Sequence, residues 1–181
     1  AIGGSELNFD DGLTLLGVEG ADLAALIRTA DYIRAADVGP VITYVVNRNI
    51  NFTNVCFVGC QFCAFARHRK DDDARTDSTE DVLAKVQDAA DRGATEICMQ
   101  GGINPEMDAF GYRDLLVAIK ARFPLIHVHA FSPMEIMYGA RRTGMNYHDY
   151  ISMLRDAGLG TIPGTAAEIL DDEVREILSH K

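Results

Sequence analysis

Three cysteines stand close together in the chain, at Cys56, Cys60 and Cys63, in a C-x3-C-x2-C pattern. Thiolates at this spacing, on a loop that follows an extended stretch, can reach three irons of one cubane 4Fe–4S cluster. The fourth iron then has no protein ligand and is open to a small molecule. An open coordination position distinguishes a catalytic metal site from a closed structural one. The pattern therefore predicts a catalytic iron–sulfur site.

Two non-catalytic interpretations use the same cysteines. A structural zinc site would take His68 as its fourth ligand, but zinc sites usually combine two ligand-bearing arms and this chain has one compact triplet. A ferredoxin-like electron carrier would need a fourth cysteine, and only the distant Cys98 is available. Cys98 is more simply a small buried residue. The spacing favours the catalytic cluster and leaves both other interpretations open.

The composition is that of an acidic globular chain. Its 181 residues, 48% of them hydrophobic, suggest one domain with a real core, and its net charge of -10 argues against a nucleic-acid partner. The longest apolar runs fall short of a membrane span and no basic-then-apolar leader opens the chain, so we expect no membrane partner and a cytoplasmic location. Because the chain starts at Ala1 and ends within an expected helix, we also expect a piece of a longer protein.

Extended and helical patterns alternate along the chain. The expected helices cover residues 21–36, 78–93, 112–123, 134–159 (with a break near Gly144) and 171–180. The expected strands cover residues 49–56, 95–102, 125–132 and 160–164, after an extended stretch at 41–46. This alternation predicts an α/β fold with a parallel sheet.

The number of these units bears on how complete the fold is. A full (β/α) barrel usually takes about 250 residues, so four strand–helix units predict a partial TIM-type barrel whose C-terminal strands are missing. We expect a mostly helical N-terminal extension over residues 1–40 and an incomplete core domain over residues 41–181.

Polar residues share one face of two expected strands. His127, His129 and Phe131 alternate with apolar residues in the strand at 125–132, as Glu96, Cys98 and Gln100 do at 95–102. Polar groups facing a barrel lumen are costly unless they are satisfied or used, and barrel enzymes place their sites at the carboxyl ends of strands. His127 and His129 are therefore predicted to contact substrate or handle protons, although each could be a satisfied structural histidine.

Longer blocks of sequence identify a family. An aromatic residue, Phe62, stands just before the third cysteine, as is typical of the radical S-adenosylmethionine (radical SAM) superfamily. Four blocks, at residues 47–66, 99–105, 127–136 and 162–175, resemble the tyrosine-using subunit of deazaflavin (FO) synthase. That family comprises the 5-amino-6-(D-ribitylamino)uracil–L-tyrosine 4-hydroxyphenyl transferases.

The resemblance implies a radical mechanism. Cys56, Cys60 and Cys63 would hold a 4Fe–4S cluster, whose open iron would be chelated by S-adenosylmethionine. An electron from an external donor would lead to a 5′-deoxyadenosyl radical, which would abstract hydrogen from L-tyrosine. The Cα–Cβ bond would break, and the 4-hydroxybenzyl group would be joined to 5-amino-6-(D-ribitylamino)uracil. A second radical SAM subunit, fused or separate, would complete the deazaflavin ring.

The resemblance also implies which residues bind ligands. Phe62 and the turn Gln100-Gly101-Gly102 would contact S-adenosylmethionine, although the two glycines could simply form a strand-to-loop turn. Further residues could contact the substrates, the last three of them also being possible helix caps: Arg48, Asn49, Asn51, Ser132, Glu135 and Glu168.

A menaquinone-pathway relative, dehypoxanthine futalosine cyclase, is the nearest alternative within the superfamily. Those enzymes tend to carry GGGAEI where residues 164–169 read GTAAEI, and often DRN where residues 47–49 read NRN. Both differences favour the deazaflavin branch.

Overall fold

The protein is described from a computed structural model that covers residues 3–164 and 169–178. Two compact units make up the chain, Ala1–Tyr44 and Val45–Lys181.

The N-terminal unit consists of two helices, α1 (Phe9–Leu16) and α2 (Gly20–Val38). Asn8 begins α1 with a capping box, in which its side chain accepts a hydrogen bond from the Asp11 amide and the Asp11 carboxylate accepts one from the Asn8 amide. Helix α2 matches the helix expected at 21–36 within two residues at each end. Neither helix has a buried residue.

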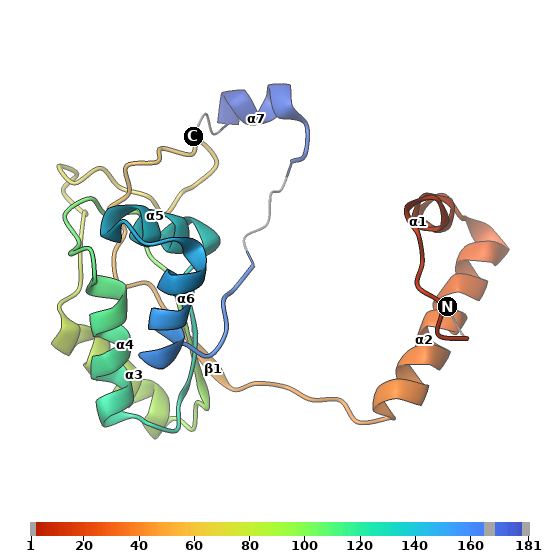
Figure 1. Cartoon of the computed structure of the whole chain (residues 1–181), viewed down its shortest axis with the longest axis horizontal. Coiled ribbons are helices and arrows are strands. Elements are labelled where there is room, and N and C mark those ends of the chain that lie inside the picture. Colours follow the sequence, from red (N-terminus) through yellow and green to blue (C-terminus); the bar gives the residue numbers. More distant parts are fainter. Residues whose placement is uncertain (1–2, 165–168, 179–181) are drawn as a thin grey trace. The chain divides into compact units, whose positions relative to one another are not determined.

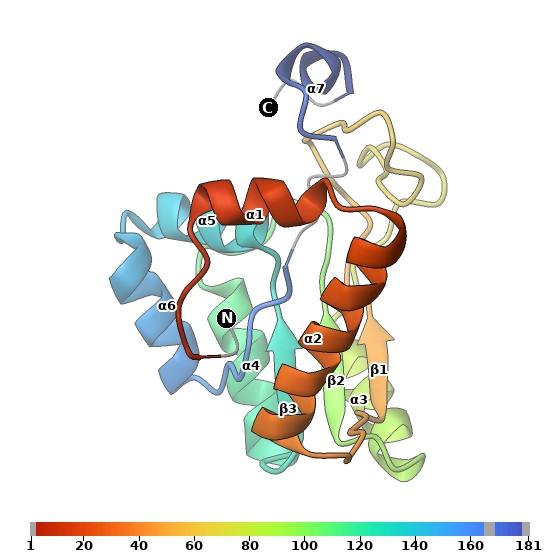
Figure 2. The same cartoon turned by 90° about the vertical axis from the view of Figure 1, so that its right-hand side faces the viewer.

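The second unit alternates strands and helices, as the sequence predicts (Figure 1). Its elements are β1 (Asn47–Ile50), α3 (Thr79–Asp91), β2 (Glu96–Met99), α4 (Gly111–Arg122), β3 (His127–Ala130), α5 (Pro133–Thr143), α6 (Tyr147–Asp156) and α7 (Asp172–Leu178). The strands form a parallel sheet in the order β1-β2-β3 and lie side by side in Figure 2. The predicted α/β fold with a parallel sheet is confirmed.

Local sequence signals explain where several helices begin and end. Ser78 and Asp81 form the predicted capping box at the start of α3. Pro133 occupies the first turn of α5, where its missing N–H costs nothing. Gly144 ends α5 in the left-handed conformation (φ 71°), which confirms the predicted break between α5 and α6.

The strands are shorter than the sequence predicts. After Ile50 the chain continues through isolated bridges, Thr53 with Thr76 and Val55 with Arg67, instead of one strand running to residue 56. The expected strand at 160–164 is a single parallel bridge between His129 and Thr161. The fourth position of the sheet is thus marked by one residue pair.

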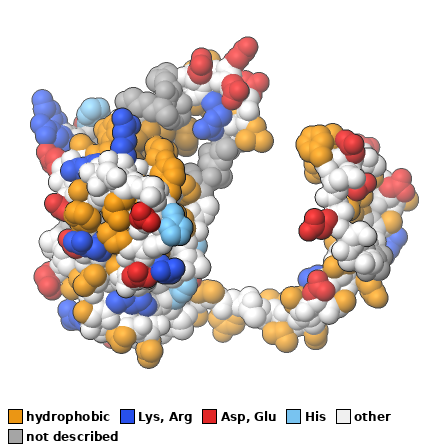
Figure 3. Space-filling view, in the orientation of Figure 1, with side chains coloured by type: hydrophobic (Ala, Val, Ile, Leu, Met, Phe, Trp, Pro, Cys, Tyr) orange, Lys and Arg blue, Asp and Glu red, His pale blue; other side chains and the backbone are white. Residues whose placement is uncertain are grey.

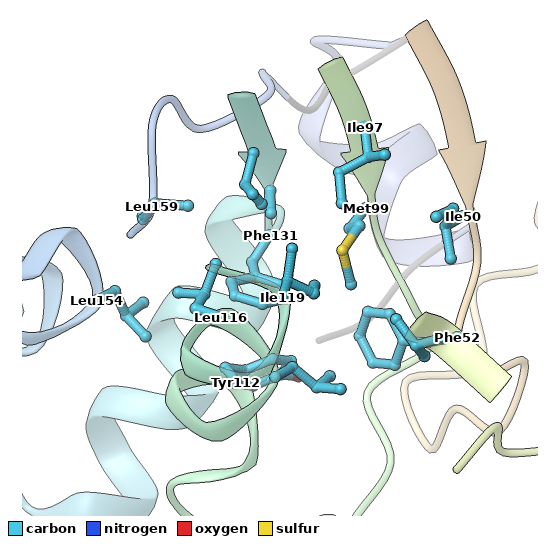
Figure 4. Close-up of a cluster of buried hydrophobic side chains, with 14 of the residues drawn as sticks. Ile50, Phe52, Ile97, Met99, Tyr112, Leu116, Ile119, Phe131, Leu154 and Leu159 are labelled. Carbon is cyan, nitrogen blue, oxygen red and sulfur yellow. The ribbon is translucent and has the colours of Figure 1, made fainter. Parts of the chain in front are cut away.

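A hydrophobic core lies between the sheet and the helices (Figure 4). One face of the strands supplies alternating buried residues, such as Ile97, Met99 and Val128, and helix α4 supplies Leu116 and Ile119. The predicted apolar and polar faces of β2 and β3 are therefore both present.

Phe131 departs from the predicted pattern. The sequence places it on the polar face with His127 and His129, but β3 ends at Ala130 and Phe131 has a positive φ of 45°. This turn directs its ring into the core, 4.6 Å from the ring of Tyr112 and 6.1 Å from that of Phe52 (Figure 4). Burial of a large aromatic side chain offsets a backbone strain of about 1–3 kcal/mol.

Candidate functional site

The cysteine loop follows β1 and is anchored by two neighbouring segments. The Cys56 amide donates a hydrogen bond to the Arg67 carbonyl (3.0 Å), and the Phe57 amide donates one to the Ile103 carbonyl (3.2 Å). The Cys63 amide donates to the Cys60 carbonyl (3.2 Å), so the last two cysteines flank a tight turn. The loop thus holds the first thiol at the carboxyl edge of the sheet.

The donor set of this loop fits an iron–sulfur cluster. Cys56 and Cys60 are half-buried, and Cys63 is exposed. Soft thiolates are the ligands of Fe–S clusters. Within residues 3–164 and 169–178, no three His, Cys, Asp or Glu side chains are gathered closely enough to hold a metal ion, so ligation rests on residue type and spacing. The same finding gives no support to a zinc site completed by His68.

The glycine turn after β2 packs directly against the segment that leads to Cys56. The Gly102 amide donates a hydrogen bond to the Thr53 carbonyl (2.8 Å). A Cβ at Gly102 would lie 2.3 Å from the Val55 carbonyl oxygen, and one at Gly101 would lie 2.9 Å from the Phe52 ring. Both positions therefore require glycine for close packing of the chain on itself, whatever ligand the turn also meets.

Glu135 connects this turn to helix α5. Its side chain is fully buried and accepts hydrogen bonds from the Gly101 amide (3.0 Å), the Ser132 amide (2.7 Å) and the Ser132 hydroxyl (2.7 Å). Burial raises the pKa of Glu135 to about 7, although these hydrogen bonds act in the opposite direction. Of the two predicted roles, the structure forms the helix cap for both Ser132 and Glu135.

The polar face of the sheet is built in two rows across the strands. In the first row, the strand register places Glu96 between Asn47 and His127. In the second row it places Cys98 beside His129. The side-chain amide of Asn47 donates a hydrogen bond to the Glu96 carboxylate (3.3 Å). Burial, followed by the charge of Glu96, raises the pKa of the Cys98 thiol.

Thr161 joins the two predicted histidines and was missed by sequence reasoning. Its hydroxyl lies 2.8 Å from His127 Nε2 and 2.6 Å from His129 Nδ1. The signal that could have found it is its position in the expected strand at 160–164, beside the strand of both histidines. His127 also has Glu96 nearby, with 3.7 Å between Nε2 and the carboxylate.

The polar residues of the β1 region divide between two sides of the sheet. Arg48 does not join the polar face, because its guanidinium pairs with Asp88 of α3. The Asn49 side chain donates to Asn51 (2.9 Å), which donates in turn to the Gln100 carbonyl (3.0 Å). Arg48 therefore forms an ion pair on the helix side of the sheet, and its contact with substrate stays a prediction.

The other predicted residues fall outside this network. Phe62 is 54% exposed on the cysteine loop. Glu168 lies outside the described residues.

The surface of the α/β unit carries interspersed acidic and basic side chains on the face drawn in Figure 3. Among the described residues, no helix combines the length and the apolar character needed to cross a membrane.

Comparison with known sequences places the chain in one protein family. The sequence profile of the radical SAM superfamily matches residues 50–181. The chain is 56% identical over 173 residues to the FO synthase of Nocardia farcinica, covering 96% of this chain and 20% of that protein. It is 48% identical over 169 residues to the 5-amino-6-(D-ribitylamino)uracil–L-tyrosine 4-hydroxyphenyl transferase of Methanothermobacter thermautotrophicus, covering 93% of this chain and 46% of that protein. The chain thus spans a minor part of each relative.

Solved structures with a similar fold are more distant in sequence. Methylornithine synthase (PylB) is 18% identical with a TM-score of 0.61, over 98% of this chain and 61% of that one. The [FeFe]-hydrogenase maturase HydG is 19% identical with a TM-score of 0.67, over 92% of this chain and 35% of that one. At this identity the likeness concerns the fold, a TIM-barrel-like α/β arrangement.

Proposed function

Because the chain belongs to the radical SAM superfamily, we propose that it forms part of a tyrosine-using FO synthase. In this role it would join the 4-hydroxybenzyl group of L-tyrosine to 5-amino-6-(D-ribitylamino)uracil. The observation that carries the proposal is the contact between the cysteine segment and the glycine turn at Val55 and Gly102. The identity to FO synthases supports the choice of substrates.

Cys56, Cys60 and Cys63 would hold the 4Fe–4S cluster and leave one iron for S-adenosylmethionine. A cluster held there would supply one-electron reduction of the bound S-adenosylmethionine. The Gln100-Gly101-Gly102 turn lies beside the cysteine segment and would position the methionyl group. Phe62, exposed on the same loop, would cover the bound cofactor.

The polar face of the sheet would receive the substrates. Its side chains offer donors and acceptors, which a phenol and a polyhydroxyl chain both require. Asn49 is exposed, and four others are half-buried: Glu96, Cys98, His127 and His129. An external electron donor and a second radical SAM subunit would complete the pathway. We take β1–β3 and the bridge at Thr161 as the first strands of a partial TIM-type barrel.

Anaerobic reconstitution with iron and sulfide, followed by S-adenosylmethionine and a reductant, tests the proposal. We expect 5′-deoxyadenosine to form, its yield to rise with L-tyrosine, and an adduct to appear when the ribitylaminouracil is added. The Cys63→Ala variant should form neither product. Stimulation by dehypoxanthine futalosine in place of tyrosine would instead assign the chain to the menaquinone branch.

A further inference from the structure

Four side chains on the polar face form one continuous polar chain. Glu96 lies near His127, His127 bonds to Thr161, and Thr161 bonds to His129. These residues come from β2, β3 and the segment after α6. We propose that Thr161 links the two histidines into a proton relay that accepts a proton from a weakly acidic ligand, such as a phenol, at His129.

The hydrogen-bond arithmetic at Thr161 requires the two imidazoles to be coupled. A threonine hydroxyl has one proton to donate and lone pairs to accept. Its bonds to His127 Nε2 (2.8 Å) and His129 Nδ1 (2.6 Å) therefore cannot both be donated by the hydroxyl while both rings are neutral acceptors. At least one ring nitrogen therefore donates, and whenever one ring accepts the hydroxyl proton, the other ring must donate to the hydroxyl oxygen.

The ends of the relay differ in a way that gives it a direction. His129 has its second ring nitrogen, Nε2, free of any hydrogen bond recorded among the described residues, and the side chain is half-buried on the polar face. His127 Nε2 lies 3.7 Å from the Glu96 carboxylate, so a carboxylate stands at this end of the relay. Among the described residues, the register places Cys98 beside His129, and burial raises the pKa of the Cys98 thiol.

The transfer balances without any redox step. The ligand gives its proton to His129 Nε2, and His129 gives the proton on Nδ1 to the Thr161 oxygen. Thr161 gives its original proton to His127 Nε2. The ligand loses one proton, His127 becomes an imidazolium beside Glu96, and Thr161 and His129 end neutral.

The backbone holds this relay in place. The Ala130 amide donates to the Thr161 carbonyl (2.9 Å), and the Gly160 amide donates to the Val128 carbonyl (2.9 Å). A Cβ at Gly160 would lie 2.3 Å from the His127 ring, so glycine at this position lets the imidazole lie flat against the chain. Thr161 is accordingly a positioning residue, fixed by the single bridge that extends the sheet.

The role of the relay in catalysis rests on the proposed function, because L-tyrosine is the phenol that FO synthases use. General acid–base groups typically contribute about 100-fold or more to rate. We therefore expect Thr161→Val to lower tyrosine cleavage by roughly 100-fold. Thr161→Ser, which keeps the hydroxyl, should restore most of the rate.

A nitrogen-15 NMR titration of the histidines in the full chain tests the relay without any substrate. In an otherwise wild-type chain, His127→Gln should change the tautomer and the titration curve of His129. In a chain that also carries Thr161→Val, His127→Gln should leave both unchanged. Thr143→Val is the matched control, since among the described residues its hydroxyl bonds to the Gly139 and Ala140 carbonyls of α5 alone.

Two results would overturn the relay. One is independent titration of the two histidines in the wild type. The other is wild-type tyrosine cleavage in Thr161→Val. Failure of the proposed function would look different, because 5′-deoxyadenosine would then be absent in every variant while the NMR coupling persisted.

Discussion

Gly102 lies so close to Val55 that a Cβ at position 102 would be 2.3 Å from the Val55 carbonyl oxygen. Val55 directly precedes Cys56, the first of the three cysteines. The turn after β2 and the loop after β1 are therefore one packed unit. Any change that separates them should affect stability and cofactor binding together.

Gly102→Ala tests this contact. The new methyl group would meet backbone atoms that cannot rotate away, and overpacking typically costs about 1–3 kcal/mol. We expect the free energy of unfolding, measured with urea, to fall by about that amount. Gly164→Ala is the control, because no atom of the described residues lies within 4 Å of its Cβ position. Equal effects of the two substitutions would contradict the close packing.

The buried carboxyl of Glu135 predicts a pH dependence of stability. Its pKa rises from 4.5 to about 7 on folding, so the folded chain keeps a proton that the unfolded chain loses. This contribution is fully present below about pH 4.5 and is lost as pH rises through about 7. We expect the free energy of unfolding to fall by on the order of 2 kcal/mol between these limits.

Glu135→Gln isolates that effect. In the variant, the free energy of unfolding measured with urea should lose this part of its pH dependence between about pH 5 and 7.5, the range in which the carboxyl titrates. The exposed Glu80→Gln serves as control and should keep the wild-type profile. A Glu135→Gln profile parallel to the wild type would show that the carboxyl does not titrate in this range.

The ion pair between Arg48 and Asp88 predicts that Arg48 does not bind substrate. Arg48→Gln should leave the KM for L-tyrosine within about twofold of the wild type. Stability should change little, because partly exposed ion pairs contribute little. A KM increase of about tenfold or more would return Arg48 to the substrate site.

Substitutions at Tyr150 and Gly139, which meet where helices α5 and α6 pack, should change the free energy of unfolding in opposite directions. The Tyr150 hydroxyl is buried and has no hydrogen-bond partner among the described residues. A Cβ at Gly139 would lie 1.9 Å from it. Tyr150→Phe should therefore raise the free energy of unfolding by about 1 kcal/mol, and Gly139→Ala should lower it by about 3 kcal/mol.

Combining both substitutions provides the internal control. Removing the hydroxyl relieves part of the clash, so the cost of Gly139→Ala should be smaller in the Tyr150→Phe background. Strict additivity in thermal or urea unfolding would argue against the contact.

Local sequence signals predicted the parts of the fold that form within a few residues of the chain. The capping box at Ser78 and Asp81 and the break at Gly144 are formed within a few residues, so their signals survive without tertiary context. The alternation in β2 and β3 likewise depends only on which side chains are apolar.

The errors arose where tertiary packing overrode that alternation. Phe131 leaves the polar face because its ring gains more by entering the core than the backbone loses at a positive φ. Thr161 was missed, although it stands in the expected strand at 160–164, because the bridge that brings it to the histidines forms only on folding.

The central claim is that Cys56, Cys60 and Cys63 together hold one cluster with an open iron. Electron paramagnetic resonance of the reduced, reconstituted chain tests it most directly, alongside its iron content. We expect about four irons per chain and a signal that changes when S-adenosylmethionine is added. Alanine at any of the three cysteines should abolish the signal, whereas Cys98→Ala and His68→Ala should keep it. Bound zinc, or a signal that ignores S-adenosylmethionine, would contradict the account.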